Sequence, residues 1–298
     1  MISEKADDTP QQTIESKLQD MATIVESGLN NVFKRQGTGF FYYAGTPVNS
    51  KAGGTKRKKL DGHWLITNRH IVLPKINDKE IIPDYFTFNF RETTANKQID
   101  WLPITYSYQE ICEKIKLHPN SLVDVAAINI DDILLETLME RKKSIIMPSS
   151  LTGDNLPGIS PFNVEAGGDV LVLSYPRGFY DTVNKLPIIK SGIVATAWGE
   201  NFNGQPTFLI DSKLFPGSSG ALVISRSTNT PIVSGRPLYN SIRKYLFLGV
   251  YSGEAFYHTA PIEIDGLSIV RKESYGLGNV WYGALIPTII EKGKSIGF

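Results

Sequence analysis

The sequence has almost no cysteine and no long apolar run. Cys112 is the only cysteine among 298 residues, so no disulfide can form within the chain, which is typical of a protein that folds in a reducing compartment. The first thirty residues are polar and lack the apolar core of a signal peptide. No later stretch approaches the roughly 18 apolar residues of a membrane-spanning helix. We therefore expect a cytoplasmic protein with no membrane contact.

The sequence also lacks an excess of charge of either sign. It carries 31 Lys and Arg residues against 30 Asp and Glu residues, for a net charge of +1. This balance predicts that nucleic acid is not a partner. The basic run KAGGTKRKK at 51–59 has no aromatic residues interleaved with its cations, so we interpret it as a solvated hairpin loop rather than a phosphate-binding surface.

Helical periodicity is scarce along the chain. Apolar spacing predicts a helix over Thr13–Asn30, a second over 132–143 and a short one over 287–295. From Gly37 onward the chain consists of short β-rich runs separated by Gly, Pro and Asn, which indicates an all-β sandwich or a pair of barrels. The segment 145–165 is the best candidate for a link between two halves, and no fixed-period repeat suggests a propeller.

The segment FPGSSGAL at 215–222 is the most informative in the chain. Glycine allows the backbone to turn with positive φ, so the N–H groups of Gly217, Ser218 and Ser219 can converge on one point beside a serine hydroxyl. Such a point is an oxyanion hole. The alternative is an ordinary polar turn, because Pro, Gly and Ser are common turn residues.

A nucleophilic serine needs a base, and the chain offers four histidines. His70 lies where the apolar strand HWLIT gives way to polar residues, a position that can face a cleft, whereas we expect His63, His118 and His258 to be structural or solvated. Asp124 precedes the apolar run VAAINI, and a carboxylate entering a buried strand requires a partner. We therefore expect Asp124 to orient His70.

The three segments together resemble one known family. LITNRHIV, DVAAINI and IDSKLFPGSSGALVI follow in the order of the histidine, aspartate and serine segments of trypsin-like (chymotrypsin-fold) serine peptidases, and the chain most resembles the bacterial Deg/HtrA branch over residues 36–290. The resemblance implies two packed six-stranded antiparallel β-barrels with an N-terminal helix and a short C-terminal helix. The implied division is a helical extension at 1–35, a first barrel at 36–150 and a second barrel at 151–298.

The resemblance also implies a function and a set of site residues. It implies a serine endopeptidase that acts on protein or peptide substrates without a metal or an organic cofactor. Ser219 would be the nucleophile, His70 the base and Asp124 the orienting acid, with the N–H groups of Gly217 and Ser219 as the oxyanion hole. The implied substrate-binding residues, of which the last three supply backbone for antiparallel pairing, are Lys213, Tyr251, Ser252 and Gly253.

Departures from the family pattern carry information. Ser218 stands where the family usually has Asp or Asn, so a new N-terminal amine would find no carboxylate there, and we expect no activation by N-terminal cleavage. Ala221 in place of Gly is a small change. Lys213 lies by alignment near the base of the specificity pocket, where it would favour an acidic side chain or else point to solvent. No Asp occupies that position, so we do not expect cleavage after Lys or Arg.

Two other functions would use parts of the same sequence: an esterase of the α/β-hydrolase fold and a gated or silent protease fold. An α/β-hydrolase elbow requires Gly at 221 and an acid and histidine downstream, and Ala221 breaks that motif. A partner-gated enzyme or a catalytically silent binding module is the stronger alternative, with a regulatory protein contacting the N-terminal helix and an insertion near 226–244. We further expect no PDZ domain of the kind that follows many Deg/HtrA protease domains.

Overall fold

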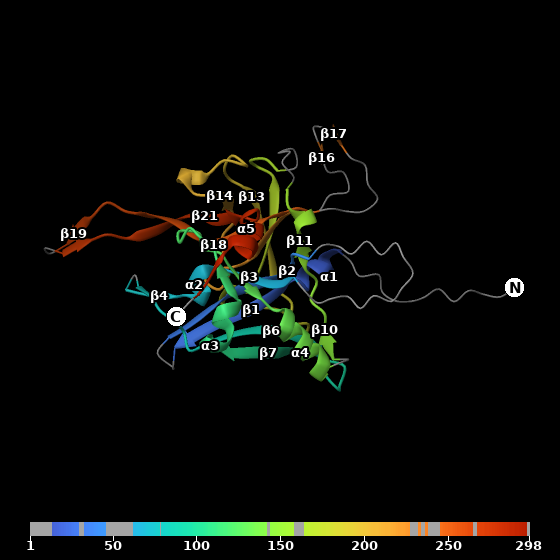
Figure 1. The fold of residues 1–298 in the computed structure, drawn as a ribbon. Helices are drawn as coiled ribbons and strands as arrows, with labels where there is room; N and C mark the ends of the chain where they lie inside the picture. Colours follow the sequence, from blue (N-terminus) through green and yellow to red (C-terminus); the bar gives the residue numbers. More distant parts are fainter. Residues whose placement is uncertain are drawn as a thin grey trace.

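The computed structural model describes residues 14–29, 33–45, 62–77, 79–141, 144–157, 164–226, 232–233, 236–237, 245–264 and 267–296. Strands dominate this part of the chain, and Figure 1 shows an N-terminal sheet beside a C-terminal barrel. The predicted all-β fold class is confirmed. The basic run at 51–59 lies outside the described residues, as does most of the segment 226–244.

The N-terminal half is a ten-stranded sheet in the order β10-β6-β1-β2-β3-β9-β8-β22, with β7 on β6 and β11 on β2. The sheet has ten strands where six were expected for this half. Residues 22–29 form one of the additional strands, and short strands extend the sheet, among them β22 from the end of the chain. The strands are β1 (Ala22–Leu29), β2 (Phe33–Tyr43), β3 (His63–Thr67), β6 (Tyr85–Thr93), β7 (Ile99–Ser107), β8 (Ile115–Leu117), β9 (Ala126–Asn129), β10 (Ile145–Ile146), β11 (Leu151–Thr152) and β22 (Lys294–Ser295).

The C-terminal half contains a closed, antiparallel barrel of six strands, as expected. Its strands, in order around the barrel, are β12 (Asp169–Ser174), β13 (Ile188–Val194), β14 (Thr207–Asp211), β21 (Lys272–Tyr282), β18 (Phe247–His258) and β15 (Leu222–Ser225). Three small hairpins lie outside both sheets: β4 (Lys75–Ile76) with β5 (Lys79–Glu80), β16 (Ile232–Val233) with β17 (Arg236–Pro237), and β19 (Ile262–Ile264) with β20 (Leu267–Ile269).

Helices are few and short in the described chain. The α-helices are α1 (Ile14–Gln19), α2 (Arg69–Val72), α3 (Tyr108–Ile111), α4 (Asp131–Arg141) and α5 (Leu285–Lys292), and the 3₁₀ turns are η1 (Cys112–Lys114), η2 (Gly153–Asn155), η4 (Pro176–Gly178) and η5 (Phe202–Gly204). The helices expected over 132–143 and 287–295 are confirmed, within a few residues, as α4 and α5. None of the helices in the described ranges is long and apolar enough to cross a membrane.

The helix expected over Thr13–Asn30 is wrong after Gln19, where the chain becomes β1 instead. All eight residues of β1 pair with β2, and Val25 to Gly28 also pair with β6 on the other edge. The β-branched Thr23, Ile24 and Val25 suit this pleated, buried setting. Pairing with two neighbouring strands therefore outweighs the helical spacing of the apolar residues.

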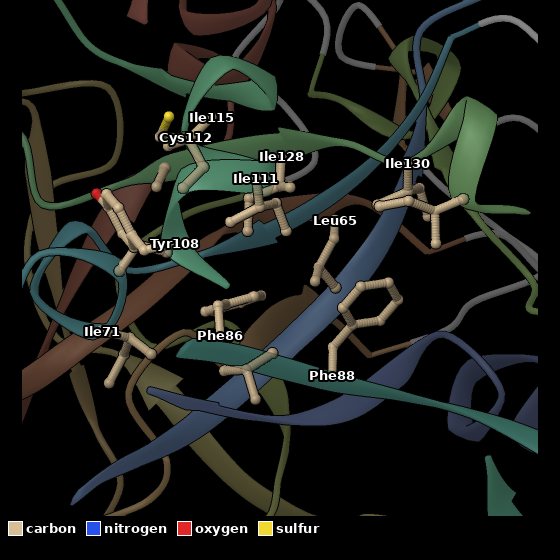
Figure 2. Packing of buried hydrophobic residues seen from close by; sticks show 14 of the residues in the cluster. Leu65, Ile71, Phe86, Phe88, Tyr108, Ile111, Cys112, Ile115, Ile128 and Ile130 are labelled. Atoms are coloured by element: carbon tan, nitrogen blue, oxygen red, sulfur yellow. The ribbon is translucent and has the colours of Figure 1, made fainter. Parts of the chain in front are cut away.

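Three buried clusters stabilise the fold, and one of them joins the two halves. One lies within the N-terminal sheet, where Phe86, Phe88 and Leu65 pack with residues of α3 and β9 (Figure 2). Another fills the barrel around Phe208 and Leu214. The third joins residues of β2, β3 and β9 to residues of β12, β15, β18 and α5, so it lies between the halves. The division at residue 150 stays a prediction, since β11 and β22 follow it in sequence yet pair with the N-terminal sheet.

Candidate active site

The pairing of β3 with β9 brings the predicted histidine and aspartate together. The two strands are antiparallel with Thr67 opposite Ala126, so the end of β3 lies beside the start of β9. His70 follows β3 in the short helix α2, and Asp124 lies two residues before the start of β9. Buried Asn68 fixes the junction, because its side-chain amide donates to the carbonyl of Asp124 at 2.7 Å.

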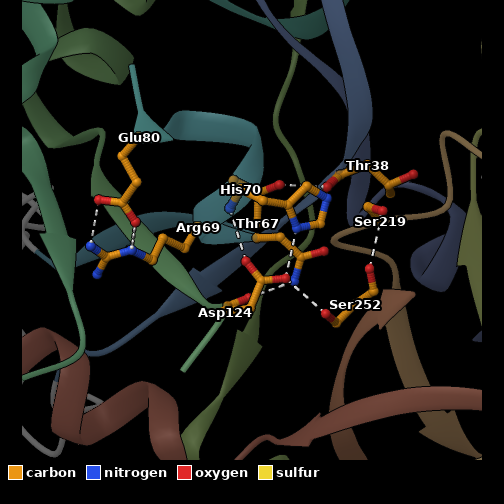
Figure 3. Close-up of polar contacts among 9 residues, drawn as sticks. Thr38, Thr67, Arg69, His70, Glu80, Asp124, Ser219 and Ser252 are labelled. Carbon is orange, nitrogen blue, oxygen red and sulfur yellow. Dashed lines mark hydrogen bonds and ion pairs between the residues drawn. The ribbon is translucent and has the colours of Figure 1, made fainter. Parts of the chain in front are cut away.

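The Asp124 carboxylate holds His70 at two points (Figure 3). Its Oδ1 accepts from the backbone N–H of His70 at 2.8 Å, and its Oδ2 lies 2.7 Å from the ring Nδ1. An ionised carboxylate only accepts hydrogen bonds, so Nδ1 carries the proton and Nε2 is left with a free lone pair. An imidazole in this tautomer can act as a base through Nε2.

The predicted nucleophile lies in a tight turn between β14 and β15. Gly217 and Gly220 flank Ser218 and Ser219 with φ of 91° and 83°, in the left-handed region that favours glycine. The N–H of Ser218 donates to the carbonyl of Phe215 at 3.0 Å, whereas the N–H groups of Gly217 and Ser219 have no acceptor within the described residues. These two N–H groups are therefore free to bind an oxyanion, and their role as an oxyanion hole stays a prediction.

Thr38 of β2 attaches this turn to the N-terminal half. Its N–H donates to the carbonyl of Ser219 at 2.7 Å, and its hydroxyl donates to the carbonyl of Gly217 at 2.9 Å. The hydroxyl of Thr67 then donates to the Thr38 carbonyl at 2.8 Å. The turn that carries Ser219 is thereby tied to the strand that ends just before His70.

Ser252 contacts both parts of the site. Its hydroxyl donates to Asp124 Oδ2 at 2.7 Å, and its backbone carbonyl accepts from the Ser219 hydroxyl at 3.2 Å (Figure 3). Sequence reasoning assigned Ser252 only a backbone role and missed Thr38 entirely. Neither contact has a local signal, because Ser252 lies 128 residues from Asp124 and Thr38 lies 179 residues from Gly217.

The structure brings Ser219 to the site without a hydrogen bond to His70. A hydroxyl has one proton, and that of Ser219 points to the Ser252 carbonyl. The Ser219 hydroxyl must turn from this carbonyl toward His70 Nε2 before its proton can pass to the imidazole. Catalytic hydrogen bonds are often long or misaligned in ligand-free enzymes and shorten with substrate.

Ser218 attaches the turn to strand β12. Its side chain is fully buried, and its hydroxyl donates to the hydroxyl of Ser174 at the end of β12, at 3.2 Å. A carboxylate at this buried position would need a cationic partner, whereas a hydroxyl is satisfied by its neighbour. The turn is therefore held at this position by a contact between two hydroxyls, and the absence of activation by N-terminal cleavage stays a prediction.

The predicted substrate-binding residues differ in their surroundings. Lys213 is exposed, and its carbonyl accepts from the ammonium of Lys190. Tyr251 is 3% exposed and packs in the barrel core, where burial and the nearby charge of Glu254 raise the pKa of its phenol. Gly253 has open space on its side-chain face, since an added Cβ would meet nothing within 4 Å. Their roles in binding substrate remain predictions.

A charged pair stands next to His70 on α2. Arg69 Nε and a terminal nitrogen contact the two oxygens of Glu80 at 2.9 and 3.0 Å (Figure 3). The hydrogen bond from Arg69 holds the pKa of Glu80 below its ordinary value. This bidentate pair ties α2 to β5 and so restrains the helix that carries His70.

The other histidines lie elsewhere. His63 begins β3, at the end opposite to His70, and forms its own pair with Asp131, with Nδ1 and Oδ1 3.2 Å apart. His118 accepts from a backbone N–H within its loop, and His258 is exposed. In the described ranges no three His, Cys, Asp or Glu residues are grouped to hold a metal ion.

Comparison with known proteins places this geometry in context. A family model described as a trypsin-like peptidase domain matches residues 37–232. The curated proteins contain no match. The solved structures that are similar include the Rv3671c protease from M. tuberculosis in its active form, at 15% identity and TM-score 0.44, covering 96% of this chain and 86% of that one.

Two further similar structures are a serine endoprotease from Yersinia pestis and the HtrA-type protease AlgW with a tripeptide. The first has 13% identity and TM-score 0.43, covering 96% of this chain and 67% of that one. The second has 13% identity and TM-score 0.44, covering 93% of this chain, and the match spans 62% of the AlgW chain.

Proposed function

Because the chain belongs to the trypsin-like peptidase family and is a serine protease, we propose that it cleaves internal peptide bonds through a triad of Ser219, His70 and Asp124. The observation that carries this proposal is the position of Ser252. Its side chain contacts the acid and its backbone contacts the nucleophile, so three segments that are far apart in sequence meet at one point.

The proposed chemistry follows from the geometry. Ser219 Oγ attacks the carbonyl carbon of the scissile bond while His70 Nε2 takes the hydroxyl proton, and Asp124 stabilises the resulting imidazolium without accepting a proton itself. The N–H groups of Gly217 and Ser219 bind the oxyanion. His70 then gives the proton to the leaving amine, which leaves an acyl-enzyme ester. Water, deprotonated by the same imidazole, hydrolyses the ester and restores Ser219.

The substrate in this proposal is an extended segment of a protein or peptide. We infer that it pairs with the backbone of Ser252 and Gly253 as an added antiparallel strand. Because Lys213 occupies the position near the specificity pocket, we do not expect a preference for cleavage after Lys or Arg. The strand pairing supports this, because within the described residues β18 has no neighbouring strand beyond Val250 on the edge opposite β21.

The direct test is labelling with a fluorophosphonate probe, combined with hydrolysis of a peptide library. Wild type and Ser218→Ala should be labelled, and Ser219→Ala should not, because Ser218 Oγ is buried and bonded to Ser174. Ser219→Ala should lose peptide hydrolysis by roughly four to six orders of magnitude. Unchanged hydrolysis by purified, folded Ser219→Ala would rule out Ser219 as the nucleophile.

One observation favours a second candidate, an enzyme held inactive until a partner or substrate binds. The Ser219 hydroxyl donates to Ser252 and not to His70, so the nucleophile is at rest in this structure. On this view turnover by the isolated protein is low and rises when a partner is added. A folded protein that is never labelled, with or without protein substrate, would instead indicate a silent binding module. A regulatory contact through α1 stays a prediction.

A further inference from the structure

A two-stranded arm extends from the barrel beside the candidate site. Glu254 of β18 pairs with Gly278 of β21, and after a register shift residues 256–258 pair with 272–274, ending with His258 opposite Lys272. The hairpin β19–β20 continues the arm, and Figure 1 shows it projecting well away from the rest of the molecule. We use the name arm for residues 254–276 as far as the structure describes them. Nothing in a barrel of this size requires its strands to continue so far.

One edge of the arm is unpaired and leads directly to Ser219. On that edge β15 pairs with β18 only as far as Val250, and the Ser219 turn adds two hydrogen bonds to Tyr251. Beyond Tyr251, β18 has β21 as its only neighbouring strand in the described chain. The Ser252 carbonyl at the start of this edge accepts from the Ser219 hydroxyl. Proteins usually block long free edges, because these edges pair with any extended chain.

The direction of β18 determines which part of a substrate would follow this edge. β18 runs outward, from Phe247 in the barrel to His258 on the arm. A chain that pairs antiparallel with it runs inward and reaches Ser219 with its C-terminal end. Residues on the N-terminal side of the scissile bond would therefore lie along Gly253 to His258, a strand length of roughly six residues.

The arm presents exposed aromatic rings on both faces. Phe256, Tyr257 and Tyr275 are 43%, 36% and 60% exposed. Tyr257 and Tyr275 share one face with ring centroids 4.8 Å apart, and Tyr257 donates to Glu273 at 2.7 Å. Phe256 lies on the other face, because neighbours in a strand alternate, and the Lys272 ammonium lies 4.1 Å from its ring centre. These contacts hold the rings in place without covering them.

We propose that the arm extends the substrate-binding edge of this protease and binds about six residues on the N-terminal side of the scissile bond. The occupant is an extended polypeptide with apolar side chains. Its backbone pairs with the free edge of β18, and its alternating side chains contact the rings on the two faces. This inference rests on the proposed function, since the same edge delivers the chain to Ser219.

The experiment uses peptides that share one cleavage site and carry zero, two, four or six apolar residues before it. For wild type, kcat/KM should rise by roughly 10-fold or more from the shortest to the longest peptide, because remote contacts contribute to transition-state binding. The triple variant Phe256→Ser, Tyr257→Ser, Tyr275→Ser should lose this gain and keep its activity on the shortest peptide. The matched control replaces three other exposed apolar residues, Leu135, Met139 and Met147, with Ser. Its kcat/KM should still rise with peptide length.

Binding measured by fluorescence anisotropy on Ser219→Ala separates this inference from the proposed function. The affinity of Ser219→Ala for the peptides should rise with peptide length. The affinity of a protein that combines Ser219→Ala with the three arm substitutions should not. Both results are expected whether or not Ser219 is the nucleophile. Normal fluorophosphonate labelling with no length dependence in either assay would overturn the inference alone. A change in molar mass of the arm variant, with length dependence intact, would overturn it in favour of an arm that joins copies of this chain.

Discussion

Asp124 is the residue through which the candidate site is organised. Three donors meet its carboxylate: the backbone N–H of His70, the ring Nδ1–H of His70 and the hydroxyl of Ser252. A half-buried carboxylate with three donors is fully satisfied as an anion. In the proposed mechanism this charge stabilises the imidazolium that forms when His70 takes a proton.

The chain supplies an internal control for this role. Asp131 contacts the same two groups of His63 at the opposite end of β3, but through Oδ1 alone: the backbone N–H at 2.8 Å and Nδ1 at 3.2 Å. Asp124→Asn should lower kcat for peptide hydrolysis by roughly 10⁴-fold, because an amide that donates to Nδ1 stabilises the wrong tautomer of His70. Asp131→Asn should leave kcat within about twofold, since nothing catalytic depends on His63. Equal losses of kcat in two folded variants would contradict the triad.

Sequence reasoning identified the residues of this site that lie in recognisable local strings. His70, Asp124 and Ser219 each occur where an apolar strand meets a polar or glycine-rich segment, which is a pattern that a single segment can reveal. Thr38 and the side chain of Ser252 act only through contacts between distant segments. Nothing in YLFLGVYSG distinguishes a serine that bonds an aspartate from one that faces solvent.

At the scale of elements, β1 shows the limit of periodicity. Leu18, Met21 and Ile24 have helical spacing, which favours a helix over this segment. In the structure Gly28 lies inside a strand, opposite Lys34 of β2 and Tyr85 of β6. Strand formation here depends on the partner strands β2 and β6, which begin 4 and 56 residues after β1 ends, at Phe33 and Tyr85. The apolar spacing within residues 13–30 carries no information about these partners and therefore favours a helix.

Gly28→Ala distinguishes the two assignments by the sign of its effect. In a helix this change stabilises by up to about 1 kcal/mol. In β1 the added Cβ would lie 2.5 Å from the Tyr85 hydroxyl oxygen and 2.7 Å from ring carbons of Tyr85, so the ring and its hydrogen bond to Glu26 must shift. We therefore expect a loss of about 1–3 kcal/mol in the free energy of unfolding, measured by urea denaturation. A stabilised variant would contradict the strand.

At the scale of the whole molecule, the candidate site is divided between the two halves. His70 and Asp124 are attached to the N-terminal sheet, and Ser219 and Ser252 belong to the barrel. Their alignment depends on the cluster between the halves, in which the Phe247 ring lies edge-on to Phe40 with centroids 5.4 Å apart. We therefore expect packing at this boundary to affect catalysis as well as stability.

Phe247→Ala tests this link between packing and activity. Removal of a fully buried ring should lower the free energy of unfolding by about 3–5 kcal/mol. Phe88→Ala removes an equally buried ring inside the N-terminal cluster, away from the boundary, and should cost a similar amount. At a temperature well below both unfolding temperatures, kcat should fall by roughly 10-fold or more for Phe247→Ala, because a small displacement between nucleophile and base lowers the reaction rate. For Phe88→Ala, kcat should stay near that of wild type. Calorimetry and peptide hydrolysis at one temperature make the comparison. If kcat is the same in both variants, the boundary stabilises the fold without aligning the site.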